Sequence, residues 1–408
     1  MLNSKTTRRN GLEKLSTLVY ILISIPIRAI QFFYPTQHHT WVFGAGNGQT
    51  FTDNSKHFYL FLLQTKINEK PVWITRNKQV LKEIRAIGGV AYHNLSLWGI
   101  HYILSAKYLV WSTSRSDVLF FNKKKTIINL WHGMPLKKIV YDYSGTSIKK
   151  TFLVSNLWSN WVVGFNHEDV AIIPSTSNFF TPFLQSAFRN QHIHTTGLPR
   201  NDVFFYHEQT DLKKQIGLQN NYIITYMPTH RKYGRGEQNP VIFVHNEKAE
   251  RYFKDHQIKI VIKLHPNMAA PLKDLHQSSF ILNGSDLVND PQELLAMTDL
   301  LITDYSSCVF DFLLLNRPVI FYHYDNYEQV EENDLYFNIE EDLPGSLAHN
   351  ESELFQEIQH VVSDETNYLD QRQQSVKLFN QFNDGLSSNR IYNLAKNRPD
   401  PNQGVEHS

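Results

Sequence analysis

The sequence predicts an α/β fold of two halves, each built on a mostly parallel sheet. From His39 onward, short apolar runs alternate with helical patterns of about 10–13 residues, the pattern of strands joined by helical crossovers. A length of 408 residues favours two domains, since one domain usually takes about 100–200 residues. With 41% hydrophobic and 19% charged residues, the composition is that of a globular protein.

Charge and cysteine content exclude several classes of protein. The formal net charge of +1 gives no bulk field to attract nucleic acid, so no nucleic-acid partner is expected. Cys308 is the single cysteine, which excludes a disulfide framework and a thiolate metal cluster. The chain has no H-E-x-x-H or Asp-x-Asp signature, so we expect neither a metal nor a cofactor.

Residues 1–35 carry the membrane signal of the chain. An apolar run from Leu15 to Ile27 is flanked by basic residues on both sides. The run has about 13 residues, whereas roughly 20 are needed to span a bilayer. The pattern predicts an amphipathic helix that lies on an anionic membrane surface. A helix packed on the protein's own core is the alternative.

The elements of the first half follow in order from residue 36. Strands are predicted at 40–45, 71–75, 90–93, 108–112 and 126–132, and helices at 53–65, 78–89 and 97–107. Asp53 and Asn54 are interpreted as capping residues of the first helix. The section 143–188 is less regular, with a further strand at 161–166.

The alternation then restarts in the second half. Strands are predicted at 222–228, 258–266, 300–307 and 317–323, and helices at 291–299 and after Ser307. The boundary falls near residues 186–195, which gives domains at 36–188 and 189–395. Residues 396–408 are predicted to form a disordered tail.

Polar side chains follow five of these segments, where parallel sheets usually bind ligands. Such residues at five strand ends predict a cleft between the two halves. They are His132 and Gly133; Arg200 and Asn201 in "TGLPRND"; Thr229 and Arg231; Lys263 and His265; and Asp304, Ser306 and Ser307.

The stretch "LLITDYSSCVFDFLLL" indicates an anion site. Ser306 and Ser307 stand at the start of a helix, where free N–H groups and the helix dipole favour a phosphate. Simple capping is the alternative for both serines. Asp311 lies four residues after Ser307, on the same helix face, and we expect it to hold a ribose hydroxyl. Arg231 could clamp a diphosphate through its bidentate fork.

His132 is the candidate general base. Histidine has an unperturbed pKa of about 6.5, which suits proton abstraction near neutral pH. Gly133 lets a substrate approach closely. Lys137 and Lys138 could meet an acceptor phosphate or an anionic membrane surface, and a solvated helix face is the alternative.

Five motifs taken together resemble the CDP-glycerol glycerophosphotransferase family, whose members build teichoic acids and glycerol-phosphate-containing capsules. They are "NLWHGMPLKKI", "TTGLPRND", "YMPTHR", "IKLHP" and "TDYSSCVFDF", in the family's order over about residues 126–320. The resemblance implies a GT-B-like architecture, with two Rossmann-like domains facing a cleft. Met134 departs from the family pattern, and we expect it to reshape the acceptor side.

The resemblance also implies roles for particular residues. His132 would be the base that activates an acceptor hydroxyl, and His265 would act with it on the donor phosphates. Gly133, Lys137 and Lys138 would lie on the acceptor side, in the first domain. The donor-binding set, mainly in the second domain, would be Arg200, Asn201, Thr229, Arg231, Lys263, Asp304, Ser306, Ser307 and Asp311.

The function implied by the resemblance is transfer of glycerol phosphate from CDP-glycerol to a hydroxyl of a lipid-linked saccharide or glycolipid acceptor, with release of CMP. The enzyme would attach peripherally to the cytoplasmic face of the cell membrane. We favour priming or short-chain transfer, because the chain is little longer than the two predicted domains. A CDP-ribitol-dependent transferase, a GT-B glycosyltransferase that uses a nucleotide sugar and a non-enzymatic membrane scaffold are the alternatives. The oligomeric state stays open.

Overall fold

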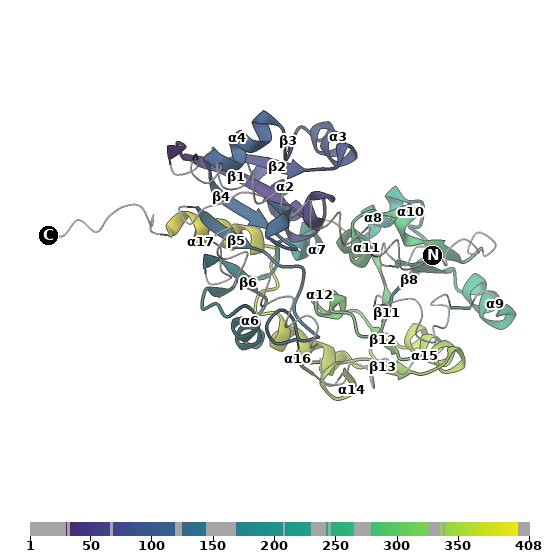
Figure 1. Ribbon diagram of the computed structural model, residues 1–408. Helices are drawn as coiled ribbons and strands as arrows, with labels where there is room; N and C mark the ends of the chain where they lie inside the picture. The colour runs from purple at the N-terminus through teal and green to yellow at the C-terminus, as the bar shows by residue number, and fades with distance from the viewer. Residues whose placement is uncertain are drawn as a thin grey trace, which may run out of the picture.

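The computed structural model describes residues 33–65, 68–118, 125–143, 169–206, 209–229, 242–243, 246–264, 279–324, 335–337 and 339–398, together with Ile30. It confirms an α/β fold with two parallel sheets, each flanked by helices (Figure 1). Several predictions lie outside the described residues. These are the apolar run 15–27, the strand at 161–166, Arg231, His265 and positions 399–408 of the tail.

The first sheet has the strand order β3–β2–β1–β4–β5, and all its neighbours pair in parallel. The order reverses between β1 and β4, the kind of switch point at which open parallel sheets bind ligands. The strands are β1 (Gln37–Gly44), β2 (Lys70–Thr75), β3 (Val90–His93), β4 (Ala106–Trp111) and β5 (Thr126–Asn129). The helices between them are α2 (Asp53–Gln64), α3 (Lys78–Ala86) and α4 (Leu97–Ser105).

The second sheet has the order β10–β9–β8–β11–β12–β13, again entirely parallel. The strands are β8 (Tyr222–Met227), β9 (Ile258–Ile262), β10 (Ile281–Asn283), β11 (Leu300–Thr303), β12 (Val319–Tyr322) and β13 (Ser346–Ala348). The helices that accompany this sheet are α8 (Gln209–Gln215), α9 (Glu247–Asp255), α10 (Gly284–Leu287), α11 (Pro291–Met297), α12 (Cys308–Phe312), α14 (Ile339–Asp342), α15 (Glu351–Ser363) and α16 (Leu369–Phe379).

A two-stranded parallel sheet lies between the two halves along the chain. It pairs β6 (Ile173–Ser175) with β7 (Ile193–Thr195), and α6 (Thr181–Phe188) joins them. An isolated bridge between Ile128 and Ile172 connects this region to β5. The predicted boundary at 188/189 falls between the paired strands β6 and β7. The chain passes to the second sheet only after β7, through a 3₁₀ turn, η4 (Pro199–Asp202), and α7 (Val203–Tyr206).

The C-terminal helix α17 (Ser387–Asn397) returns to the first half of the molecule (Figure 1). Ile391 and Ala395 are buried in the same core cluster as Trp41 of β1. Lys396 Nζ lies 2.8 Å from Glu69 Oε1, just before β2. Helix α17 includes Lys396 and Asn397, the first two residues of the tail that the sequence predicted as disordered.

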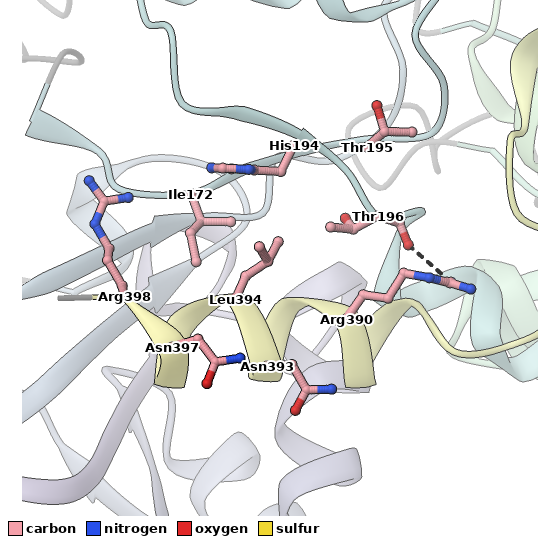
Figure 2. Close-up of a pocket in the computed structure, with 9 residues that line it drawn as sticks. All are labelled: Ile172, His194, Thr195, Thr196, Arg390, Asn393, Leu394, Asn397 and Arg398. Carbon is pink, nitrogen blue, oxygen red and sulfur yellow. Dashed lines mark hydrogen bonds between the residues drawn. The ribbon is translucent and has the colours of Figure 1, made fainter.

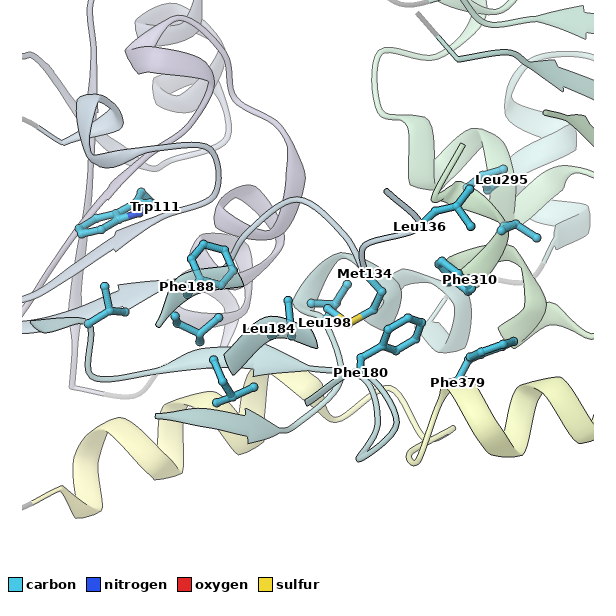
Figure 3. Close-up of a cluster of buried hydrophobic side chains, with 14 of the residues drawn as sticks. Trp111, Met134, Leu136, Phe180, Leu184, Phe188, Leu198, Leu295, Phe310 and Phe379 are labelled. Atoms are coloured by element: carbon cyan, nitrogen blue, oxygen red, sulfur yellow. The ribbon is translucent and has the colours of Figure 1, made fainter. Parts of the chain in front are cut away.

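One buried cluster joins the two halves. It contains residues of both sheets, such as Val42 of β1 and Leu301 of β11. Figure 3 shows Phe180, Phe310 and Phe379 side by side, and the ring centroids of Phe180 and Phe310 are 4.9 Å apart. Met134 belongs to this cluster and is 1% exposed. Its side chain therefore packs mostly in the core, but it also lines the pocket described below, and its effect on the acceptor side stays a prediction.

Candidate active site

A pocket of about 550 Å³ is lined by residues that follow strands of both sheets. The first half contributes the start of α2 and the turn after β5. The second half contributes the segments after β8, β9 and β11. The predicted site residues that line it are His132, Gly133, Lys137, Arg200, Thr229, Lys263, Ser306 and Ser307. The described parts of the five strand-end motifs therefore meet at one place.

The turn after β5 brings His132 into this pocket. Strand β5 ends at Asn129 instead of the predicted residue 132, and Trp131 adopts a positive φ of 52°. The buried Asn54 holds the turn, because its Nδ2 donates to the Trp131 carbonyl oxygen at 2.9 Å. Gly133 follows with a φ of 134°, where L-residues are rarely found.

His132 is exposed toward the pocket and has the electrostatic properties of a base. Desolvation by the protein atoms that crowd the ring lowers its pKa, and the positive charge of Arg200 acts in the same direction. The Asp53 carboxylate opposes this by raising the pKa of His132. A net lowering leaves the imidazole neutral at neutral pH, so that it can accept a proton.

Arg200 connects the turn at His132 to the second half. Its Nη1 donates to the His132 carbonyl oxygen at 2.8 Å and to Asp53 Oδ1 at 3.1 Å. Its Nη2 forms a short ion pair with Asp311 Oδ2. Burial alone would lower the pKa of Arg200, but Asp311 and Asp53 outweigh it and raise the pKa. Arg200 therefore stays charged and holds the two halves together behind His132.

Asp311 and Asn201 lie behind Arg200 and not at the pocket surface. Asp311 is 2% exposed, and its Oδ1 accepts a hydrogen bond from Asn201 Nδ2 at 2.8 Å. Asn201 Oδ1 in turn accepts a hydrogen bond from Gln292 Nε2 at 2.6 Å. Both oxygens of Asp311 are engaged inside the protein, and a contact with a ribose hydroxyl stays a prediction. Asn201 is likewise hydrogen-bonded inside the protein, and its contact with a donor stays a prediction.

Asp304 fixes the loops that follow β8 and β11. It is fully buried, and its Oδ1 accepts hydrogen bonds from Thr229 N at 2.8 Å, Thr229 Oγ1 at 2.6 Å and Tyr305 N at 2.6 Å. Asp304 therefore shapes the pocket wall, and its predicted contact with a donor stays a prediction. Thr229 does line the pocket.

Ser306 and Ser307 line the pocket immediately before α12. The Ser307 side chain makes no capping hydrogen bond to its helix, so simple capping does not account for it. A Cβ atom placed on Gly133 would lie 3.4 Å from Ser307 Oγ. This hydroxyl of the second half therefore stands next to the His132 turn of the first half.

Three lysines were predicted at the site. Lys263 Nζ donates to the Val288 carbonyl oxygen at 2.7 Å, and burial lowers its pKa. Lys137 lines the pocket, whereas Lys138 is not among the described lining residues. Within the described parts of the chain, no three His, Cys, Asp or Glu side chains gather as a possible metal site.

Sequence reasoning missed the role of α2 in the site. Asp53 and Asn54 were interpreted only as caps, but Asp53 lines the pocket and has a positive φ of 65°. One turn further on, Lys56 Nζ and His57 Nε2 contact Asp290 Oδ2 at 2.5 and 3.0 Å. Asp290 caps α11 of the second half. The sequence gives no sign of these contacts, because the partners are more than 200 residues apart.

Comparisons with known proteins find similar sequences and a similar fold. A family model described as CDP-glycerol:poly(glycerophosphate) glycerophosphotransferase matches residues 27–396. A teichoic acid glycerol-phosphate transferase of Staphylococcus aureus is 27% identical over 366 residues, or 86% of this chain and 90% of that protein. A teichoic acid poly(glycerol phosphate) polymerase of Bacillus spizizenii is 27% identical over 368 residues, or 85% and 89%. A solved structure of the wall teichoic acid polymerase TagF shares the fold, with a TM-score of 0.75, 22% identity and 97% of each chain covered.

Proposed function

Because this chain belongs to the CDP-glycerol:poly(glycerophosphate) glycerophosphotransferase family, we propose that it transfers glycerol phosphate from CDP-glycerol to a hydroxyl of a membrane-linked acceptor in teichoic acid synthesis. The observation that carries the proposal is that His132 and Ser307, from opposite halves, line one pocket. Transfer of a phosphate group to a hydroxyl requires a base on one side of a gap and, on the other side, groups that donate hydrogen bonds to the phosphate.

In the proposed mechanism, His132 takes the proton of the acceptor hydroxyl while that oxygen attacks the phosphorus atom that carries the glycerol. The new P–O bond forms as the bond from this phosphorus to the CMP oxygen breaks, and CMP leaves with the electron pair. The lowered pKa of His132 supports this role, because the ring is neutral before the reaction. Asp53 would then stabilise the imidazolium that forms, since it raises the pKa of His132.

The donor would lie against the second half, within a GT-B-like arrangement of two Rossmann-like domains facing a cleft. Ser306, Ser307 and Thr229 line the pocket and offer hydroxyl groups to its phosphates. Arg231 and His265 stay predictions as donor contacts, and both follow segments that line the pocket. On the acceptor side we propose Gly133, Lys137 and Lys138.

We further propose that the enzyme works peripherally at the cytoplasmic face of the cell membrane, where a lipid-linked acceptor is presented. The predicted amphipathic segment in residues 1–35 supports this. Within the described parts of the chain, no helix is both long enough and apolar enough to cross a bilayer.

The test is the substitution His132→Ala. Base catalysis typically contributes 10²–10⁴-fold, so we expect CMP release with acceptor present to slow by about that factor. CDP-glycerol should still bind, as measured by calorimetry, because the donor would lie on the other half. His360→Ala, an exposed histidine on α15, is the matched control and should keep full activity. Unchanged turnover in His132→Ala would remove the base assignment.

Substrate choice is tested separately with the intact chain. CDP-glycerol, CDP-ribitol and UDP-sugars are each incubated with a lipid-linked saccharide, and nucleotide release is measured. We expect CMP release with CDP-glycerol, and UDP release instead would support the glycosyltransferase alternative. Mass spectrometry of the products counts the units added, which tests the expectation of short-chain transfer.

A further inference from the structure

A second pocket lies between β7 and α17, away from the residues that line the His132 pocket. Its volume is about 520 Å³, close to that of the first. The two pockets share no lining residue. Ile172 and Leu394 contribute apolar surface, and His194, Arg390 and Arg398 contribute nitrogen atoms around it (Figure 2).

The charged side chains of this second pocket are all basic. Its described lining residues include Arg390 and Arg398 but no aspartate or glutamate. Arg390 is paired with Asp384, which lies outside the lining. Arg398 Nη1 donates to the Ala171 carbonyl oxygen at 2.5 Å, and it forms no ion pair with a carboxylate in the described ranges. The positive charge of Arg398 is therefore left without a counter-charge inside the pocket.

His194 adds an unused hydrogen-bonding atom next to this charge. Its Nε2 is buried and has no hydrogen-bond partner within geometric limits among the described residues. Figure 2 shows the His194 ring extending toward the Arg398 guanidinium. Burial lowers the pKa of His194, and the nearby His192 and Arg398 lower it further. Arg398 and His194 are thus held near one another, and the described lining of this pocket contains no acidic side chain. A bound anion would favour the protonated form of His194.

We propose that this second pocket binds a phosphate ester, with Arg398 and His194 as its main contacts. A phosphate group presents several acceptor oxygens and can take hydrogen bonds from the guanidinium fork and from a protonated Nε2 at once. The apolar surface of Ile172 and Leu394 suits the carbon skeleton of the ester. The proposal does not depend on the reaction at His132, because it concerns a separate set of residues.

The experiment follows the ring signals of His194 by NMR in the full chain labelled with ¹³C-histidine. The signal is assigned by its loss in His194→Gln, and sn-glycerol 3-phosphate is the probe. We expect saturable shifts and a higher pKa of His194 with the probe bound, because an anion stabilises the protonated ring. Arg398→Gln should weaken binding about tenfold, the usual effect of losing a charge-assisted hydrogen bond.

Two variants test whether weaker binding comes from the lost contact with Arg398 or from a change in folding or in net charge. Arg398→Lys keeps the positive charge and should retain most of the binding. Arg251→Gln, on the exposed face of α9, removes the same charge elsewhere and should bind like the unaltered chain. Equal affinities in Arg398→Gln and Arg251→Gln would overturn the assignment.

Further probes distinguish the sources of phosphate. Inorganic phosphate should shift the His194 signal more weakly than the ester, because it has no carbon skeleton to contact Leu394. The proposal fails if neither probe moves the signal, if inorganic phosphate binds and the ester does not, or if only phosphatidylglycerol vesicles have an effect. The last result would assign the pocket to a membrane surface.

Discussion

Gly133, next to His132 in the chain, occupies a space that is too small for a side chain. A Cβ atom at this position would lie 2.7 Å from Arg200 Nη2, and the backbone φ is 134°. Close approach and an unusual backbone conformation therefore both require glycine here. Arg200 can hold the His132 carbonyl oxygen only because this space is empty.

We expect Gly133→Ala to lower turnover by about 10²-fold, because displacement of Arg200 moves the His132 turn and a shift of about 1 Å can cost that much. The measurement is CMP release with CDP-glycerol and acceptor. Gly217→Ala is the matched control, since it has a φ of 75° but nothing within 4 Å of a new Cβ. It should cost about 1 kcal/mol of stability and no activity. Equal turnover in the two variants would contradict the packing argument.

Desolvation lowers the pKa of His132, and the Asp53 carboxylate partly opposes this by raising it. Asp53→Asn should therefore lower the pKa of His132. As the ring must be unprotonated to act as a base, the acidic limb of the kcat/KM profile should move to lower pH. NMR titration of His132 checks the same shift without any turnover. Asp255→Asn, exposed on α9, removes an equal charge and should leave both curves in place.

Single residues also show what the sequence can and cannot predict. The sequence indicated that Asp311 needs a partner, since a carboxylate inside an apolar helix is rarely left unpaired. It could not identify Arg200 as that partner, because 111 positions separate them. His132, Gly133, Ser306 and Ser307 were predicted to share a site because strand ends of parallel sheets converge. Asp53 was missed because its role depends on contacts that only the folded chain creates.

At the scale of elements, helix α2 links the two halves through Lys56 and His57. Lys56 Nζ and His57 Nε2 both contact Asp290 Oδ2, while Asp290 Oδ1 accepts a hydrogen bond from Gln292 N at 2.9 Å. Burial alone would raise the pKa of Asp290, but His57 and Lys56 outweigh it and hold the pKa well below its usual range. One buried carboxylate thus serves as helix cap and as ion-pair partner.

Asp290→Ala should destabilise the protein by about 3 kcal/mol, because it removes the nearer carboxylate partner of the half-buried Lys56, removes the partner of His57 and leaves α11 uncapped. Asn350→Ala removes only the cap of α15 and should cost about 1 kcal/mol. Because the pKa of Asp290 is depressed by folding, its contribution is present above the unfolded pKa of about 3.9 and is lost as pH falls below it. Thermal unfolding at pH 7 and pH 3 measures the loss of stability in each variant and its dependence on pH. Equal losses of stability in Asp290→Ala and Asn350→Ala at pH 7 would refute the ion-pair argument.

Strands and helices were predicted well where apolar runs alternate, and less well at their ends. The predicted strands 258–266 and 300–307 stop at Ile262 and Thr303 in the structure. The polar residues beyond these points form pocket loops, and strand propensity carries no information about loops shaped by side chains such as Asp304. Strands β10 and β13 are only three residues long and gave too little pattern to predict.

At the scale of the whole molecule, the sequence predicted the fold class and the family. The two parallel sheets confirm the α/β class, and the match to the family model confirms the family. It did not predict that helix α17 packs against the first sheet. Helix α17 follows the second half in sequence, but Tyr392 lies near Trp41 with ring centroids 5.9 Å apart. No periodicity in α17 specifies which sheet it covers, because an amphipathic helix fits many apolar faces.

The return of α17 leads to a last prediction about coupling. Ile391 is fully buried against the first sheet, so Ile391→Ala should cost about 2–5 kcal/mol of stability. Because α17 covers β1, hydrogen exchange should become faster in the peptide that contains Trp41 and Phe43, although the substitution lies in the last described helix. Asn389→Ala, on the exposed side of α17, should change neither quantity. If exchange rises in α17 alone, the helix frays independently and does not stabilise the first sheet. Faster exchange in β1 would instead show that the C-terminal helix and the sheet behind His132 unfold as one unit.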